Sequence, residues 1–238
     1  ISNMSKYTFF DRETNTKLSL LQTLYQEEFW CSTKYLVKKL NLDRRTTIKY
    51  LKLLQEDSQS LLDYEEPIIQ DEKGKGFKFV GNKVDYHHLI YKLIADSTAF
   101  SFIQDLYFHR SIQIEDFCET HFVSETSIKK LIRKVNFFFK PHKVKLLIVK
   151  GEIYVSGNEL AFRYFGYIFF WNTFKGIVWP FEQIISESTV RHFIQKIFSK
   201  YSDLTSITLS QWSYVFAINS GRIKNGYILS KEDLPDYA

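Results

Sequence analysis

Apolar residues recur at every third or fourth position over most of the chain, and Gly and Pro residues seldom interrupt them. The leucines between residues 17 and 26 fall on one side of a helix in this way. A short second helix is predicted after Ser32 and Thr33, whose hydroxyls suit a helix start. A third helix is expected from Arg44 to about Glu56, with Asp43 as its N-terminal cap.

Segments with the composition of β-strands follow this third helix. Residues 67–70 and 77–80 flank Gly74-Lys75-Gly76, which predicts a β-hairpin. The same order then returns, as one or two helices over 85–108, a helix over 114–121, a helix over 125–139, and strands over 144–149 and 152–155 that meet at Lys150-Gly151. Helix, helix, turn, helix and hairpin is the order of a winged helix-turn-helix domain.

The two predicted third helices begin alike. Arg45-Thr46-Thr47-Ile48-Lys49 can be laid over Glu125-Thr126-Ser127-Ile128-Lys129 at an offset of 80 residues (126 − 46). A repeated unit of this kind is a stronger sign of its fold than either copy alone. We therefore predict tandem winged helix-turn-helix domains.

After Asn158 the pattern changes to apolar helices, expected over 159–174, 188–200 and 210–223. The predicted fold class is mainly α with small β-hairpin wings, ending in an all-helical regulation-like domain. The expected domains are an N-terminal tail over 1–12, winged helix-turn-helix domains over 13–82 and 83–157, and an incomplete helical domain over 158–238.

Composition and charge point to a folded protein with a polyanionic partner. Hydrophobic residues make up 45% and charged residues 25% of the chain, as in ordinary globular proteins. The net charge is only +5, but seven basic residues and one acid lie between Lys34 and Lys52. Eight basic residues and no acid lie between Lys129 and Lys150. Two local basic patches on a nearly neutral chain favour binding to nucleic acid.

These patches fall on the predicted third helices, which is where a helix-turn-helix protein contacts the major groove. Arg45 is the best candidate for a bidentate contact to guanine, and Lys49 and Lys52 suit phosphates. The predicted DNA-binding residues are Lys34, Arg44, Arg45, Thr46, Thr47, Lys49, Lys52 and Lys75 in the first copy, and Ser124, Thr126, Ser127, Lys129, Lys130, Arg133 and Lys134 in the second.

Other classes of protein have little support. The two cysteines lack a paired spacing, which favours a reducing compartment, and the N-terminus lacks a signal peptide, so we expect a cytoplasmic protein. The apolar stretch 162–179 is interrupted by charges and predicts a buried helix, with no membrane partner. Cys118 and His121 have no further ligands nearby, so neither a metal nor another cofactor is expected. No Gly-rich phosphate loop, nucleophile elbow or paired-carboxylate motif indicates an enzyme.

The stretch Ile114-Glu-Asp-Phe-Cys-Glu-Thr-His-Phe-Val-Ser-Glu-Thr126, the basic helix after it, and Gly157-Asn158-Glu159 leading into Phe162-Arg-Tyr-Phe165 resemble the Mga/AtxA group of virulence regulators from Gram-positive bacteria. The resemblance extends over the whole chain. It implies two N-terminal winged helices that bind promoter DNA, then regulation domains of the sugar phosphotransferase system and a C-terminal module that supports homodimers. On this basis the chain corresponds to the N-terminal portion of such a regulator.

The resemblance also implies control by phosphotransferase proteins through histidines of the regulation domains. A histidine is expected near Tyr227, and this chain has none there. His192 is the remaining candidate phosphoacceptor in the helical part, against the alternative of a histidine packed beside Phe193.

Three other functions stay open at this point. A plasmid replication initiator also uses paired winged helices, and would bind repeated origin sites. An RNA-binding antiterminator carries similar regulation domains, but begins with a small β-rich module that the helical N-terminal pattern does not match. A sensor or scaffold protein would lack nucleic-acid affinity altogether.

Overall fold

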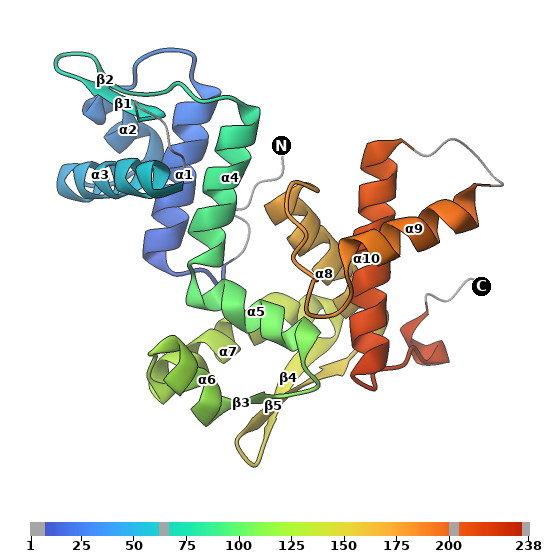
Figure 1. The fold of residues 1–238 in the computed structure, drawn as a ribbon. Helices are drawn as coiled ribbons and strands as arrows, with labels where there is room; N and C mark the ends of the chain where they lie inside the picture. Colours follow the sequence, from blue (N-terminus) through green and yellow to red (C-terminus); the bar gives the residue numbers. More distant parts are fainter. Residues whose placement is uncertain (1–7, 62–66, 200–204, 235–238) are drawn as a thin grey trace. The chain divides into compact units, whose positions relative to one another are not determined.

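The computed structural model describes residues 8–61, 67–199 and 205–234 (Figure 1). It is mostly helical, with small antiparallel sheets. The chain divides into two compact units, which we call unit 1 (Ile1–Phe100) and unit 2 (Ser101–Ala238). The boundary falls inside helix α5 (Thr98–Phe108). The finer division into three domains remains a prediction.

Unit 1 is a helical core with a hairpin on one side. Its elements are α1 (Arg12–Gln26), α2 (Thr33–Leu40), α3 (Arg44–Leu61), β1 (Ile69–Glu72), β2 (Gly76–Phe79) and α4 (Lys83–Ala95). In Figure 1, α1 and α4 run side by side and α3 crosses them, and α1 contacts both. Leu20, Leu21, Leu36, Leu51 and Leu54 are fully buried where these helices meet. Burial of such side chains stabilises the unit by about 1.5–3 kcal/mol each.

Helix α1 begins at Arg12, earlier than the apolar pattern from residue 17 predicts, because its first turn consists mostly of polar residues. The Thr14 backbone N–H donates to the Asp11 carboxylate at 2.7 Å, so Asp11 caps the helix. The buried Thr16 hydroxyl bonds to the Arg12 carbonyl within the first turn. Phe9 is buried just before the helix, although it lies in the expected N-terminal tail. Of that tail, residues 1–7 lie outside the described residues.

Helix α4, which the sequence predicts at the start of the second repeat, contacts α1 and α3 and falls in unit 1. The rings of Tyr86 on α4 and Tyr25 on α1 stack with centroids 3.8 Å apart, which contributes to this contact. The domain boundary between residues 82 and 83 stays a prediction.

The β1–β2 hairpin is held against the start of α2 by its backbone. The N–H of Cys31 donates to the Phe77 carbonyl at 2.8 Å, and the N–H of Phe77 donates back at 2.9 Å. This close approach depends on Gly76, which has φ +107 and whose added Cβ would lie 2.2 Å from the Cys31 carbonyl oxygen. The hairpin is thereby fixed beside the α2–α3 pair.

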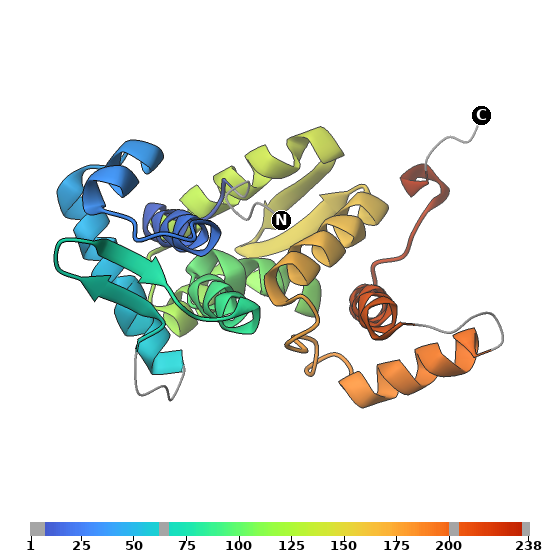
Figure 2. The same ribbon diagram turned by 90° about the horizontal axis from the view of Figure 1, so that it is seen from above.

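Unit 2 repeats the order of helices and hairpin and then adds further helices. It contains most of α5, then β3 (Ile112–Gln113), α6 (Ile114–His121), α7 (Glu125–Phe139), η2 (Lys140–His142), β4 (Val144–Val149), β5 (Glu152–Gly157), α8 (Glu159–Phe174), α9 (Glu187–Phe198), α10 (Ser206–Lys224) and η3 (Lys231–Asp233). The three strands form an antiparallel sheet in the order β3-β5-β4. Figure 2 shows α8 lying alongside the β4–β5 hairpin, which it contacts.

Several elements of unit 2 are confirmed residue for residue. The helices predicted over 114–121, 125–139 and 159–174 have those bounds. Lys150 and Gly151 both have positive φ (49 and 83), which is the backbone of the predicted two-residue hairpin turn. The helix expected over 188–200 ends earlier, at Phe198, and Lys200 lies outside the described residues.

A buried ionic network joins α5, α8 and α10 within unit 2. The Arg222 guanidinium on α10 is fully buried and donates to both carboxylate oxygens of Glu159, at 2.9 and 2.8 Å. It also donates to the Leu106 carbonyl on α5 at 3.0 Å. Arg163 donates to the same Glu159 at 2.9 Å. Removal of one partner from such a buried network typically costs about 3–5 kcal/mol, so the added helices are integral to unit 2.

Within the described residues, no helix is both long enough and apolar enough to cross a lipid bilayer.

We expect Gly76→Ala to destabilise unit 1 far more than Gly74→Ala. Both glycines have positive φ, but a Cβ at Gly74 would meet no atom within 4 Å, whereas at Gly76 it would collide with Cys31 backbone. The Gly74 substitution should cost about 1 kcal/mol for its backbone conformation, and the Gly76 substitution clearly more. Thermal unfolding followed by circular dichroism measures both, and equal losses would show that the hairpin contact contributes nothing.

Candidate nucleic-acid interface

The turn between α2 and α3 is built by local backbone hydrogen bonds. Asn41 ends α2 in the left-handed conformation, with φ 52, and the Leu42 N–H donates to the Val37 carbonyl at 3.2 Å. Asp43 then caps α3, because its carboxylate accepts from the Thr46 N–H at 2.8 Å. A turn of this kind sets the two helices of a helix-turn-helix motif at a fixed angle.

The turn between α6 and α7 has the same construction. Phe122 ends α6 with φ 52, and the Val123 N–H donates to the Cys118 carbonyl at 3.1 Å. Ser124 caps α7 by accepting from the Ser127 N–H at 3.2 Å. The two units therefore contain one structural motif twice.

This geometry corrects the internal alignment by one residue. Asn41 matches Phe122, and the cap Asp43 matches the cap Ser124, so the structural offset is 81 residues (124 − 43) and not 80. The burial of the core residues supports the offset of 81, because Leu51 and Ile132, which it makes equivalent, are both buried. The sequence match rested on two isoleucines that do not occupy equivalent positions.

The corrected alignment explains why the prediction for Thr47 is wrong. Thr47 is fully buried, and its hydroxyl donates to the Asp43 carbonyl at 2.9 Å. It occupies the position of Ile128, which is equally buried. Thr47 therefore contributes to the core of unit 1 and is not available for a contact with DNA.

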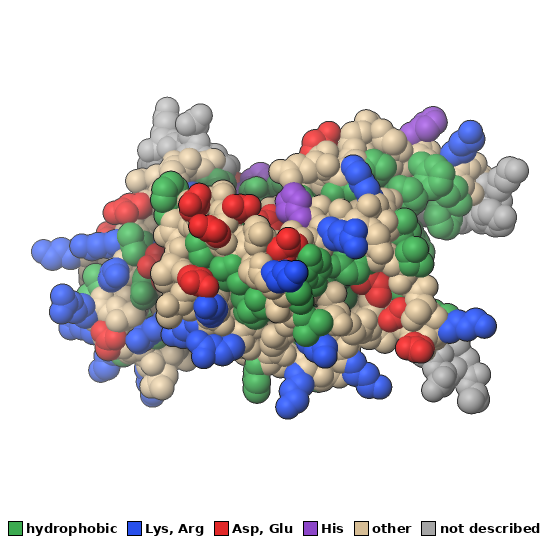
Figure 3. All heavy atoms as spheres, turned by 90° about the horizontal axis from the view of Figure 1, so that it is seen from below, with side chains coloured by type: hydrophobic (Ala, Val, Ile, Leu, Met, Phe, Trp, Pro, Cys, Tyr) green, Lys and Arg blue, Asp and Glu red, His purple; other side chains and the backbone are tan. Residues whose placement is uncertain are grey.

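The other predicted side chains on the two helices reach solvent. Lys49 matches Lys130, and Lys52 matches Arg133, and all four are exposed. Figure 3 shows Lys and Arg side chains concentrated at the end of unit 1 where α2 and the start of α3 lie. The remaining exposed predicted residues are Lys34, Arg44, Arg45, Lys75, Ser124, Thr126, Ser127 and Lys129, while Thr46 and Lys134 are half-buried.

Lys129 differs from its neighbours because it forms an ion pair. Its ammonium lies 2.8 Å from the Glu125 carboxylate, one turn earlier on α7. Exposed pairs of this kind contribute little, about 0.3–0.5 kcal/mol. The match of Lys49 with Lys130 therefore gives the better pair of equivalent cationic positions for the two motifs.

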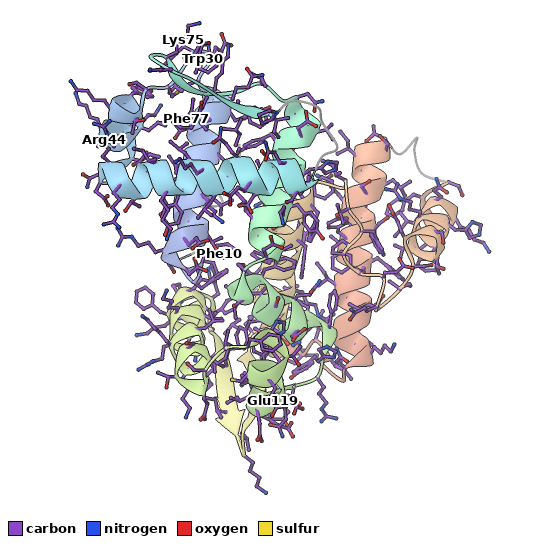
Figure 4. The ribbon with its side chains drawn as sticks, turned by 60° about the vertical axis from the view of Figure 1, so that its left-hand side comes forward. Phe10, Trp30, Arg44, Lys75, Phe77 and Glu119 are labelled. Atoms are coloured by element: carbon purple, nitrogen blue, oxygen red, sulfur yellow. The ribbon has the colours of Figure 1, made fainter. Side chains whose placement is uncertain are left out.

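In unit 1 a hollow of about 670 Å³ lies between the helix pair and the hairpin. Four cations line it, from α2, α3 and the hairpin turn, together with the acids Asp71 and Glu72: Lys34, Arg44, Lys73 and Lys75. Figure 4 shows Lys75 and Trp30 together at the tip of the hairpin and Arg44 at the start of α3. The Lys75 ammonium lies 5.8 Å from the Trp30 ring centre and 2.7 Å from the Glu72 carboxylate.

Unit 2 has a comparable hollow of about 590 Å³ between the end of α7 and the start of its hairpin. Lys140, Lys143 and Lys145 line it together with the exposed ring of Phe137. The sequence placed these three lysines in the basic patch between Lys129 and Lys150 but not among the predicted DNA-binding residues, and it did not single out Lys73 or Trp30. They come together only because each hairpin folds back beside the helices.

The first helix of each pair differs in charge. On α2 the exposed residues include Lys34, Lys38 and Lys39, and the last of these is bonded to Glu27, which raises the pKa of its ammonium. On α6 the exposed residues include Glu115 and Glu119, and Figure 4 labels the second of these. The α2 surface therefore attracts phosphates and the α6 surface repels them.

Of the remaining candidate groups, Cys118 and His121 form no metal site within the described part of the chain. The Cys118 thiol is raised in pKa by burial, which disfavours the thiolate that a metal would need, and the His121 ring packs 4.1 Å from that of Phe117. The described residues contain no group of three or more side chains able to hold a metal ion. The His192 side chain is exposed on α9.

Comparison with known proteins identifies the second motif. Residues 82–170 match the Mga helix-turn-helix domain family, a range that contains α6, the turn at Phe122 and α7. The resemblance to Mga/AtxA-like regulators is therefore confirmed.

Two curated relatives align over nearly the whole chain. One is the putative trans-acting regulator of Streptococcus pneumoniae serotype 4, 21% identical over 92% of this chain and 43% of that protein. The other is the capsule synthesis positive regulator AcpB of Bacillus anthracis, 21% identical over 91% of this chain and 44% of that protein. The chain spans less than half the length of each of these relatives.

We expect unit 1 to lose stability in acid, because protonation of Asp43 weakens the cap of α3. Hydrogen bonds from the Thr46 side chain and backbone hold the pKa of Asp43 below its usual value. The carboxylate is thus favoured in the folded state, so its stabilisation is complete above the usual Asp pKa of about 3.9 and is lost as the pH falls through the lower folded value.

Asp43→Asn keeps a good cap that does not titrate. Melting temperatures measured between about pH 2 and pH 6 should therefore fall less steeply in the variant. Parallel curves for the two proteins would show that the Asp43 carboxylate is not what stabilises the turn.

Proposed function

We propose that this chain is the DNA-binding portion of a transcription regulator that places α3 and α7 in major grooves, with the two hairpins as wings. The single observation that carries the proposal is the duplicated turn at Asn41 and Phe122, each followed by a capped helix with exposed cations at equivalent positions. The match of residues 82–170 to the Mga helix-turn-helix domain supports the same function for the second copy.

The exposed side chains suggest separate roles along α3. Arg45 lies in the first turn, where recognition helices meet base edges, and its guanidinium suits a bidentate contact to guanine. Lys49 and Lys52 lie one and two turns later and suit phosphates. On α7 the corresponding residues are Thr126 for bases, and Lys130 and Arg133 for the backbone.

The two motifs would dock differently. In unit 1 the lysines of α2 and those lining the hairpin hollow add phosphate contacts around α3. In unit 2 the acids of α6 keep that helix away from phosphates, so α7 and the lysines beside the hairpin carry the binding. Unit 1 should therefore contribute the larger share of the salt-dependent affinity.

The helices after β5 would form the start of a regulation domain, joined to α5 by the hydrogen bond that Arg222 donates to the Leu106 carbonyl. The exposed His192 on α9 is the candidate for phosphorylation by phosphotransferase proteins. Homodimers, control of virulence genes and action at promoters follow from the Mga/AtxA resemblance and belong to the same proposal. The name of the relative AcpB, a regulator of capsule synthesis, is in keeping with it.

Footprinting on genomic fragments, followed by affinity measurements over a salt series, tests the proposal. A regulator should protect promoter regions, whereas a replication initiator should protect repeated origin sites. The logarithm of affinity should fall linearly with the logarithm of salt concentration, as counterions are released. Absence of salt-dependent binding to any duplex would leave a scaffold function as the better explanation, and preference for RNA would favour an antiterminator.

We expect the double variant Lys49→Ala, Lys130→Ala to weaken binding to all sequences alike. Each lost phosphate contact should flatten the salt slope by about 0.9, or about 1.8 for both. Arg45→Ala should instead relax the choice of base at one position, at a cost of about 1–3 kcal/mol.

Lys196→Ala, which removes an exposed cation from α9, is the matched control and should change neither quantity. An equal loss of affinity in the control, or an unchanged slope in the double variant, would mean that α3 and α7 are not the binding surface.

A further inference from the structure

Phe122 is the most exposed large apolar side chain of the described residues, at 96%. It also has φ 52, a left-handed conformation that bulky side chains rarely adopt. Both features are unfavourable for folding, since neither burial nor backbone preference stabilises a phenyl ring there. At this exposure the ring makes almost no packing contact within the described part of the chain.

The chain itself shows what the turn requires. At the equivalent place in unit 1 stands Asn41, with the same φ of 52 and the same hydrogen bond from the N–H of the next residue to the carbonyl five residues before that residue. Asn tolerates this conformation and is exposed without cost. The turn therefore forms well without an aromatic ring, and Phe122 is a substitution specific to the second motif.

The ring lies where a docked helix would bring it to DNA. Phe122 precedes the α7 cap Ser124 by two residues. It therefore lies beside the N-terminus of α7, the end at which a recognition helix contacts base edges. Thr126 follows in the first turn, and Lys130 and Arg133 flank it with positive charge. An apolar group held at this edge of the groove meets the 5-methyl group of thymine, the apolar feature that the groove presents.

We propose that Phe122 is a specificity-determining residue whose ring contacts a thymine 5-methyl group beside the bases read by α7. The proposal rests on the proposed function, because it requires α7 to lie in the major groove. It assigns to unit 2 an apolar contact that unit 1, with Asn41, does not make. The second motif would then compensate for the repulsive acids of α6 with base readout rather than with more charge.

The test uses the whole chain and a duplex carrying its footprinted site. Each thymine of the site is replaced in turn by deoxyuridine, which lacks only the methyl group. Loss of one buried methyl should weaken wild-type binding roughly 4-fold at the contacted position. Phe122→Asn, which gives the second turn the residue type of Asn41, should bind the thymine duplex several-fold more weakly than wild type does. Its affinity should be the same for the duplex that carries deoxyuridine at the contacted position.

Two measurements keep the result interpretable. Phe122→Asn should melt at an equal or higher temperature than wild type, because Asn suits the turn, so weaker binding would not reflect unfolding. Tyr164→Ser, which removes another exposed ring from α8 in the same unit, should keep the wild-type response to deoxyuridine.

Wild-type binding that ignores every deoxyuridine, or a Phe122→Asn variant that keeps the wild-type loss, would overturn the proposal while leaving the salt-dependent DNA binding intact. Weaker binding by Phe122→Asn with unchanged methyl dependence would assign the ring to a protein contact instead, which also overturns it. Absence of any DNA binding by the wild type would overturn the proposed function together with this inference.

Discussion

The structure depends on one backbone constraint, the left-handed residue between the two helices of each motif. With Asn41 or Phe122 at φ 52, the N–H of the next residue donates to a carbonyl of the helix just ended, and the cap of the following helix lies two residues later. This local geometry sets the direction of α3 and α7 before any tertiary packing is considered. The exposed cations of these helices then face solvent because the opposite stripe, which includes Leu51 and Ile132, is required for the core.

The two motifs share this backbone constraint but differ in the side chains that surround it. Unit 1 surrounds its motif with lysines and an arginine, from α2 and from the hairpin held by Gly76. Unit 2 has acids on α6 and an exposed aromatic ring at the turn. The two motifs share the turn backbone and the buried stripe, since both are needed for folding, and differ in their exposed side chains.

Unit 2 also couples its motif to the helices that follow. Arg222 is held by Glu159 and by the Leu106 carbonyl of α5, with its guanidinium 3.7 Å from the centre of the Tyr227 ring. The α5 helix in turn packs on α6 through the rings of Phe102 and Phe117. Helix α10 is thus connected to the second motif by a buried hydrogen bond to α5 and by an aromatic contact between α5 and α6.

The sequence by itself determined the elements whose signals are local: the helices over 114–121, 125–139 and 159–174, the Lys150-Gly151 turn, and the exposed stripe of α7. Apolar spacing, caps and turn residues specify these over a few residues. Only the tertiary structure decided which threonine of the first motif is buried, that α4 packs on α1, and which lysines meet beside the hairpins. Thr46 and Thr47 have the same side chain, and the direction in which α3 leaves the turn decides which of them is buried. Contacts between distant segments depend on that packing, and no short window of sequence records it.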